Sequence, residues 1–351
     1  MVNHLTLEQK IGQLLIIGFQ GTSSEDSGVQ TVIEDIKASR IGGVIPYRYN
    51  IRKAEQITTL NHLFLEAAEE ADLPTLFTTV DQEGGKVQRL GPEKGFQGFP
   101  SPEEVITKEV SEIQEIYRAM ATELKDCGFN WDFAPCVDMN PEGYKCPVLG
   151  ELQRLYGSDT DSVVKYAGIM IDVFHEEKML NCIKHFPGHG SAQKDSHQGF
   201  VDVTDVWKKE EMDPFFKLAK KGKVDAVMTA HVFNEKLDDT YPATLSKITL
   251  KKLRRAGYEG VIISDDLHMS AIQEKFEFEE AAVKALQAGN DMVIYSNNTS
   301  AAASIEGFAP DPDLPGKFIQ VILDAIEKKE LSEKQIEDSF ARVQKLKKKL
   351  A

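Results

Sequence analysis

Short apolar runs alternate with amphipathic stretches along most of this chain. Each run is followed by polar or glycine-rich residues and, in most cases, by a helical pattern. The eight runs are Gln13–Gly18, Gly42–Pro46, Thr75–Val80, Asn130–Val137, Asn181–His185, Ala226–His231, Gly260–Ser264 and Asp291–Tyr295. Runs this uniformly apolar are typical of parallel strands that are covered by helices on both faces.

The stretches between the runs predict helices. The clearest patterns are Arg52–Glu70, Pro102–Cys127, Asp161–Lys178 and Phe276–Ala288. Capping-box sequences at 6–9 and 332–335 predict two further helix starts near the chain ends. The last helix has an apolar stripe at Ile336, Phe340 and Val343.

Eight strand–helix units that close on themselves make an α/β fold of the (β/α)8 TIM-barrel type, which needs about 250 residues or more. A doubly wound open sheet is the alternative. Polar clusters follow most of the runs, and in a barrel these strand ends meet on one face, which favours the barrel. We expect a single domain over residues 1–351, with C-terminal helices from about residue 317 after a loop at 309–316, which contains three prolines.

Composition indicates a soluble protein that acts on a small molecule. The chain has 351 residues, is 41% hydrophobic and carries a net charge of −15, which argues against nucleic acid or an anionic membrane as a partner. The N-terminus lacks the pattern of a signal peptide, and no apolar stretch is long enough to span a membrane. We therefore expect a cytoplasmic monomer whose four cysteines are reduced.

The segment Lys184–Gly190 (KHFPGHG), followed by Asp195 and His197, is the strongest candidate for chemistry. Titratable side chains on a glycine-rich loop after a buried strand are typical of an active site. Asp195 and His197 are close enough in sequence to pair, and such a pair suits proton transfer near neutral pH. A zinc site that uses His185, His189 and His197 ranks lower, because Pro187 and Gly188 exclude the helix of an HExxH motif.

Carboxylates at two further strand ends are candidates for the same site. Asp265 and Asp266 directly follow the seventh run, where one of them can serve as a nucleophile or cap a helix. After the third run, Asp81 and Arg89 suit the binding of sugar hydroxyls, whereas Glu83 beside two glycines is compatible with a turn cap.

Two other residues are ambiguous from the sequence. Arg154 lies in a long loop, where an arginine is usually a solvated surface residue. His231 ends the sixth run and is equally compatible with a hydrogen-bonded packing role.

Together these segments resemble the bacterial β-N-acetylglucosaminidases of glycoside hydrolase family 3. The most specific match is KHFPGHG with the later DSH. It is supported in the same order along the chain by the segments Asp81–Arg89, Met228–Ser246 and Ser264–Met269. The resemblance extends from about Gln9 to Asn297.

The resemblance implies a TIM-barrel retaining hydrolase that removes terminal β-linked N-acetylglucosamine without a cofactor or metal. It assigns the nucleophile to Asp265 and the acid/base to His197 paired with Asp195. The sugar-binding positions of the family correspond to Asp81, Arg89, Arg154, Lys184 and His185. It further implies action on anhydro-muropeptides in cell-wall recycling.

One segment departs from the family pattern. The family has a sequence close to PVIGxRSFG, whereas this chain has Pro147–Gly157, which is two residues longer and has Leu155 in place of serine. The departure concerns the placement of Arg154 and the shape of the site on the leaving-group side.

Three other functions fit the same residues. A glycoside phosphorylase would also use a histidine acid/base, because a carboxylate base repels phosphate. A catalytically inactive sugar-binding protein and a metal-dependent amidohydrolase-like barrel are the others. The intact Asp265, Asp195 and His197 argue against the inactive protein, and product analysis with and without phosphate separates the hydrolase from the phosphorylase.

Overall fold

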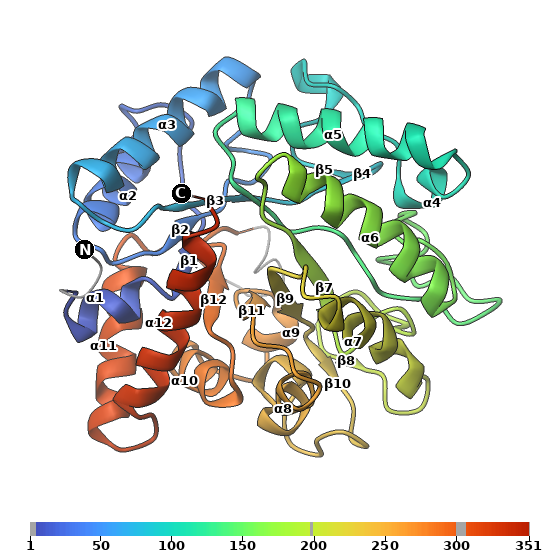
Figure 1. Ribbon diagram of the computed structural model, residues 1–351. Coiled ribbons are helices and arrows are strands. Elements are labelled where there is room, and N and C mark those ends of the chain that lie inside the picture. Colours follow the sequence, from blue (N-terminus) through green and yellow to red (C-terminus); the bar gives the residue numbers. More distant parts are fainter. Residues whose placement is uncertain (1–4, 197–198, 300–306, 351) are drawn as a thin grey trace.

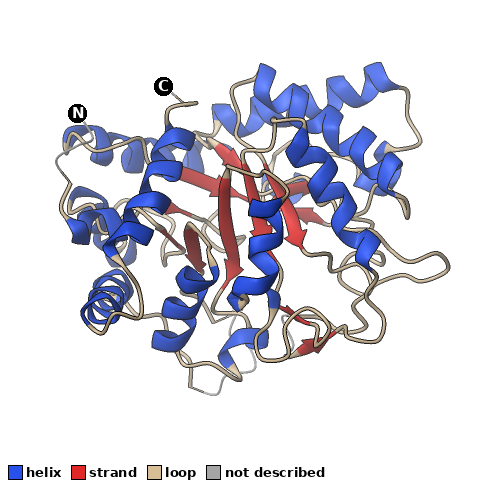
Figure 2. Cartoon of the chain, turned by 60° about the horizontal axis from the view of Figure 1, so that its bottom comes forward, coloured by secondary structure: helices blue, strands red, loops and turns tan. Residues whose placement is uncertain are grey.

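The computed structural model describes residues 5–196, 199–299 and 307–350. Eight parallel strands lie at the centre, and the helices surround them (Figures 1 and 2). The strands are β1 (Leu15–Ile17), β2 (Gly43–Val44), β3 (Phe77–Val80), β6 (Trp131–Asp132), β7 (Cys182–Phe186), β9 (Ala226–Thr229), β11 (Val261–Asp266) and β12 (Met292–Tyr295). Each strand overlaps one of the eight runs expected from the sequence, and no strand extends more than two residues beyond its run.

The sheet is a closed barrel and not an open sheet. Its strand order is β6-β3-β2-β1-β12-β11-β9-β7. Parallel bridges from Trp131 to Leu180 and from Cys136 to Lys184 join the two end strands, which completes the ring. The sequence expectation of a (β/α)8 barrel is thus confirmed.

Twelve α-helices are present in the described residues. They are α1 (Leu7–Gly12), α2 (Ser27–Lys37), α3 (Ala54–Glu70), α4 (Pro102–Val105), α5 (Val110–Asp126), α6 (Thr160–Glu176), α7 (Asp213–Lys220), α8 (Lys247–Arg255), α9 (Ser270–Gln273), α10 (Phe278–Ala288), α11 (Leu314–Glu327) and α12 (Glu333–Lys347). Both expected capping boxes are formed, by Thr6 with Gln9 and by Ser332 with Gln335.

Two expected boundaries are wrong. The stretch expected as one helix over 102–127 is divided between α4 and α5, because the helical hydrogen bonds stop after Val105 and resume at Val110. The expected loop at 309–316 overlaps α11, which begins at Leu314. Pro315 lies in the first turn of that helix, where the missing N–H of proline breaks no helical hydrogen bond.

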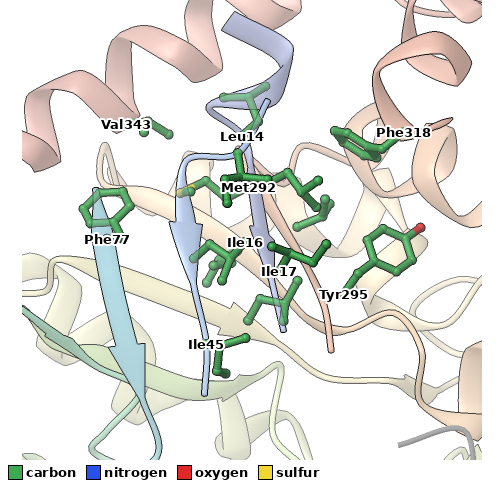
Figure 3. Close-up of a cluster of buried hydrophobic side chains, with 14 of the residues drawn as sticks. Leu14, Ile16, Ile17, Ile45, Phe77, Met292, Tyr295, Phe318 and Val343 are labelled. Carbon is green, nitrogen blue, oxygen red and sulfur yellow. The ribbon is translucent and has the colours of Figure 1, made fainter. Parts of the chain in front are cut away.

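Buried aliphatic and aromatic side chains fill the barrel and the layer beneath the helices. Ile16 of β1 and Met292 of β12 belong to one cluster with Phe318 of α11 and Val343 of α12 (Figure 3). All four are at most 3% exposed, and full burial of such a side chain contributes about 1.5–3 kcal/mol. The last two helices are thereby attached to the first and last strands.

The helix α12 covers the N-terminal end of the barrel. Lys347 donates hydrogen bonds to the Gln13 Oε1 atom (2.8 Å) and to the Gly42 carbonyl (3.2 Å), which precede β1 and β2. Arg342 pairs with Asp291 at 2.9 Å, immediately before β12. This end of the barrel is therefore closed, and the polar residues that follow the strands lie at the opposite end.

Two short pairs of strands lie outside the barrel. The hairpin of β4 (Gln82–Gly84) and β5 (Val87–Gln88) follows β3 directly. The parallel pair of β8 (Val201–Asp202) and β10 (Val232–Phe233) follows β7 and β9 (Figure 2). Both additions therefore extend the carboxyl ends of barrel strands.

All four cysteines are buried free thiols, as expected. Among the described helices, none has the length and apolar character needed to cross a membrane.

Candidate active site

The carboxyl ends of the barrel strands surround a cavity of about 360 Å³. Seven of the eight site residues expected from the sequence line it: Asp81, Arg89, Arg154, Lys184, His185, Asp195 and Asp265. They come from segments up to 184 positions apart in the chain, between Asp81 and Asp265. The eighth, His197, lies outside the described residues.

Lys184 is the central cation of the site. It is 3% exposed, and its Nζ atom donates to Asp81 Oδ1 at 2.9 Å and to Glu83 Oε1 at 2.7 Å. The other oxygen of Asp81 accepts a hydrogen bond from Arg89 at 2.8 Å. Burial opposes ionisation of Asp81, but Lys184 and Arg89 outweigh it and hold the pKa of this carboxyl well below its usual range.

Glu83 and Arg154 form a buried bidentate ion pair. Arg154 donates from Nε and Nη2 to the two oxygens of Glu83 at 2.8 and 2.7 Å, and from Nη1 to the Val148 carbonyl at 3.0 Å. Burial alone would raise the pKa of Glu83, yet Arg154 and Lys184 lower it from 4.5 to about 2. The longer segment at 147–157 thus keeps Arg154 in the site, and the interpretation of Glu83 as a turn cap is wrong.

Asp138 orients the histidines that follow β7. Its Oδ2 atom accepts a hydrogen bond from His185 Nδ1 at 2.7 Å, and its Oδ1 atom accepts from the His189 backbone N–H at 2.8 Å. The contact with Nδ1 fixes the orientation of the His185 ring and leaves Nε2 as the nitrogen for a ligand in the cavity.

The two adjacent carboxylates at the end of β11 have separate roles. Asp265 lines the cavity, whereas Asp266 is buried and its Oδ1 atom accepts hydrogen bonds from the backbone N–H groups of His268 (3.0 Å) and Ser296 (2.9 Å). Burial raises the pKa of Asp266 to about 6. The structural function thus falls to Asp266, and Asp265 is the carboxylate that lines the cavity.

The loop that carries Asp195 is attached by Glu211 to the short helical turn that precedes α7. This buried carboxylate accepts hydrogen bonds from the Ser191 hydroxyl, the Ser191 N–H (3.2 Å) and the Lys208 N–H (3.0 Å). A Cβ atom at Gly188 would lie 2.5 Å from the Cβ of Glu211, so only glycine fits at this contact. The start of the loop is therefore tightly packed.

One group of residues has the donor atoms of a metal site. The ligand atoms of Cys136, Asp138 and His185 lie within 4.8 Å of one another. The Cys136 thiol and His185 Nδ1 both hydrogen-bond to Asp138 Oδ2. Burial raises the pKa of the Cys136 thiol well above its usual value, which disfavours the thiolate form that metals bind.

Several residues of the site are not assigned from the sequence as sugar-binding or catalytic. Arg48, Glu83 and His189 line the cavity, and Asp138 lies behind His185. His189 and Glu83 belong to the KHFPGHG and Asp81–Arg89 segments, whereas the signal for Arg48 and Asp138 is a position after a strand. His231 is a packing residue, because its ring nitrogens contact Thr244 Oγ1 and the Asp266 carbonyl, both at 2.8 Å.

Comparison with known proteins supports the same family. The profile of the Glycosyl hydrolase family 3 N terminal domain matches residues 6–346. A β-hexosaminidase of Haemophilus influenzae is 32% identical over 83% of this chain and 81% of its own length. β-Hexosaminidase A of Pseudoalteromonas piscicida is 30% identical over 99% of this chain, which spans 62% of that protein.

Among solved structures, a family 3 β-N-acetylglucosaminidase from Paenibacillus sp. has a similar fold. It superposes with a TM-score of 0.85 at 31% identity, and the match covers 99% of this chain and 63% of the Paenibacillus protein. This chain therefore spans somewhat less than two thirds of some relatives and most of others.

Proposed function

Since the chain belongs to the β-hexosaminidases of glycoside hydrolase family 3, we propose that it removes terminal β-linked N-acetylglucosamine with retention of configuration. Asp265 is the nucleophile, and His197 with Asp195 is the acid/base. The observation that carries this proposal is that seven of the eight residues assigned from the resemblance line one cavity.

In the first step, an oxygen of Asp265 forms a bond to the anomeric carbon while the bond from that carbon to the leaving oxygen breaks. The imidazolium of His197 gives its proton to the leaving oxygen, and the charge of Asp195 favours that imidazolium. In the second step, the neutral imidazole takes a proton from water, the hydroxide attacks the anomeric carbon, and Asp265 is released.

The charged network holds the sugar in place for this reaction. Asp81 and Glu83 are ionised at neutral pH, so their remaining lone pairs accept hydrogen bonds from sugar hydroxyls. Lys184 and Arg89 supply positive charge beside Asp81, and His185 offers Nε2. These side chains are held in fixed positions by one another before substrate binds, which lowers the entropic cost of orientation.

We further propose that the substrates are anhydro-muropeptides from cell-wall recycling, that the enzyme is a cytoplasmic monomer, and that it uses neither cofactor nor metal. The negative net charge of −15 supports a small-molecule partner over nucleic acid or an anionic membrane.

The test is release of nitrophenol from the β-N-acetylglucosaminide and from the β-glucoside, by the wild type and by Asp265→Asn, with and without phosphate. We expect turnover of the first substrate only, independent of phosphate and lost in Asp265→Asn. Asn is isosteric with Asp, so an unchanged Tm will show that the loss reflects chemistry.

Other outcomes would contradict specific parts of the proposal. Formation of N-acetylglucosamine 1-phosphate would indicate a phosphorylase. Binding of N-acetylglucosamine without turnover would indicate a sugar-binding protein, and retained activity in Asp265→Asn would show that another group is the nucleophile. Loss of activity with a chelator, restored by zinc, would indicate a metal-dependent barrel.

A further inference from the structure

The cavity that contains Asp265 has more positive charge than its mechanism uses. The cations that line it are Arg48, Lys86, Arg89, Arg154 and Lys184. The last three pair with the carboxylates of Asp81 and Glu83. In the part of the chain that the structure describes, Arg48 and Lys86 form no ion pair with a carboxylate, although the protein as a whole has a net charge of −15.

Backbone carbonyl groups hold these two cations at the rim of the cavity. The Nη2 atom of Arg48 donates to the carbonyl oxygens of Lys86 and Gln88, both at 3.2 Å. The Nζ atom of Lys86 donates to the Glu151 carbonyl at 3.2 Å. Because these acceptors are neutral, they orient the two side chains without cancelling their charge. Both side chains are exposed, so an anionic ligand in the cavity has access to them.

Lys94 adds a third positive charge on the same side of the cavity. Its Nζ atom donates to the Arg48 carbonyl at 2.7 Å. Burial lowers the pKa of Lys94 and Glu93 opposes this effect, but the charges of Arg48 and Arg89 lower the pKa further. The cations are therefore close enough to repel one another, and an anion bound among them would relieve that repulsion.

The two unpaired cations lie across the cavity from Asp265. In the ring of strands, β3 is four places from β11 in either direction. Lys86 lies in the β4–β5 hairpin that follows β3, and Arg48 follows the neighbouring strand β2. In the proposed reaction the anomeric carbon contacts Asp265. The opposite side of the sugar ring, with C4 and the exocyclic C6, therefore faces Arg48 and Lys86.

We infer that the site also accepts a terminal N-acetylglucosamine that has a phosphate monoester at C6, and that Arg48 and Lys86 bind this phosphate. The inference rests on the proposed function, which places the anomeric carbon at Asp265. Because C6 is exocyclic, its substituent reaches far from the anomeric carbon toward these cations. The phosphate stays on the sugar, and the bonds that form and break are those of the proposed reaction.

The chemistry of the cations favours a phosphate over a carboxylate. A phosphate monoester has a charge of about −1.5 to −2 at pH 7, which three neighbouring positive charges match better than the single charge of a carboxylate. The arginine fork donates to two phosphate oxygens, and the lysine ammonium adds a compact charge.

The first test compares kcat/KM on nitrophenyl β-N-acetylglucosaminide with and without a phosphate at C6. The proteins are the wild type, Arg48→Gln and Lys86→Gln. We expect the ratio of kcat/KM for the phosphorylated substrate to that for the unphosphorylated one to fall about tenfold in each variant, which is the effect of losing one hydrogen bond to a charged group. In the wild type this ratio should also decrease as salt is added, because both cations are exposed.

Arg52→Gln is the matched control. Arg52 is exposed and lies four positions after Arg48, but it does not line the cavity. This variant loses the same charge as Arg48→Gln and should keep the wild-type ratio. A decrease as large as that in Arg48→Gln would show that only the overall charge of the protein matters, which overturns the inference.

The second test measures competitive inhibition of the unphosphorylated reaction by N-acetylglucosamine, by its 6-phosphate and by inorganic phosphate. We expect the inhibition constant of the 6-phosphate to be about tenfold below that of N-acetylglucosamine, and this advantage to decrease in Arg48→Gln. Inorganic phosphate should be the weakest of the three. If it inhibits as strongly as the sugar phosphate, the cations bind free phosphate and the inference is overturned.

The outcomes separate the inference from the proposed function. A wild type that turns over only the unphosphorylated substrate overturns the inference and leaves the proposed function intact, as does a ratio that neither Arg48→Gln nor Lys86→Gln changes. Absence of turnover on both substrates by the folded wild type contradicts the proposed function and, with it, this inference.

Discussion

At the scale of single residues, Lys184 is the cation that pairs with two carboxylates of the site, Asp81 and Glu83. Its ammonium contacts Asp81 and Glu83 in a position that is 3% exposed. Of the described residues, Lys184 is the one cation that both carboxylates share, and it stabilises their charged forms together with Arg89 at Asp81 and Arg154 at Glu83.

We expect Lys184→Met to lower the free energy of unfolding by about 3–5 kcal/mol, because it leaves buried carboxylates without their shared cation. Urea denaturation of the variant measures this loss. Lys37→Met is the control, since Lys37 pairs with Glu70 on the exposed surface and such pairs contribute little. Equal effects of the two substitutions would show that the buried network does not stabilise the fold.

The neighbours Asp265 and Asp266 offer a second test at this scale. Asp266→Ala removes the acceptor for the N–H groups of His268 and Ser296 and should destabilise the protein by about 1–3 kcal/mol for each buried group left unsatisfied. Asp265→Asn should retain the wild-type Tm and lose activity. Thermal unfolding and nitrophenyl assays of both variants measure this contrast, and a lower Tm for Asp265→Asn would contradict the division of roles.

At the scale of elements, Glu211 couples the start of the 188–196 loop to the segment before α7. The Glu211 side chain is buried, and burial raises the pKa of its carboxyl from 4.5 to about 7. The folded protein therefore holds a proton on Glu211 that the unfolded chain releases near pH 4.5. This contribution to stability is greatest at low pH and declines as the pH rises from about 4.5 to 7.

Glu211→Gln should be less stable than the wild type, because an NH2 group replaces one of the two carboxyl oxygens and cannot accept a hydrogen bond from the Ser191 or Lys208 groups that now donate to both oxygens. The difference in Tm between the two should be larger at pH 5 than at pH 8, since only the wild type loses stability over this range. Thermal unfolding at both pH values is the measurement. A difference that is constant or grows with pH would mean that Glu211 is ionised in the folded state at pH 5.

The elements themselves were largely predictable from the sequence. The barrel strands are recognisable because buried parallel strands are apolar throughout, and this property is local. The break between α4 and α5 was not predicted, because Ile106–Glu109 continues the amphipathic pattern while its backbone leaves the helix.

The contacts of the site were less predictable. Arg154 was ambiguous from the sequence and Glu83 was interpreted as a turn cap, yet they form an ion pair across 71 positions. No local sequence pattern indicates an ion pair between residues this far apart in the chain. The resemblance identified the positions of Arg154 and Lys184, but the fact that Glu83 joins them follows only from the fold.

At the scale of the whole molecule, Lys347 connects the last helix to the first strands. It is buried against the Phe77 ring and two oxygen acceptors, and burial lowers the pKa of its ammonium from 10.5 to about 7. The unfolded chain binds this proton up to about pH 10.5, so the contribution of Lys347 to stability increases as the pH rises from about 7 to 10.5.

Lys347→Met tests this effect. The stability of the variant relative to the wild type should be highest at or below pH 7 and should decrease toward pH 10, because only the wild type gains stability over that range. Urea unfolding at pH 7 and pH 10 measures the change. A relative stability that is independent of pH would show that Lys347 has the same pKa in the folded and the unfolded protein.

The pairing of β1 with β12 has a consequence for how the chain is synthesised. Ile17 lies opposite Tyr295 in the ring, and Gln13 meets Lys347 334 positions later. At roughly 5–20 residues per second, translation takes on the order of tens of seconds to pass from one partner to the other. During that interval β1 can pair with β2 on one edge, whereas its other edge is without β12 and the barrel cannot close until the last strand is made.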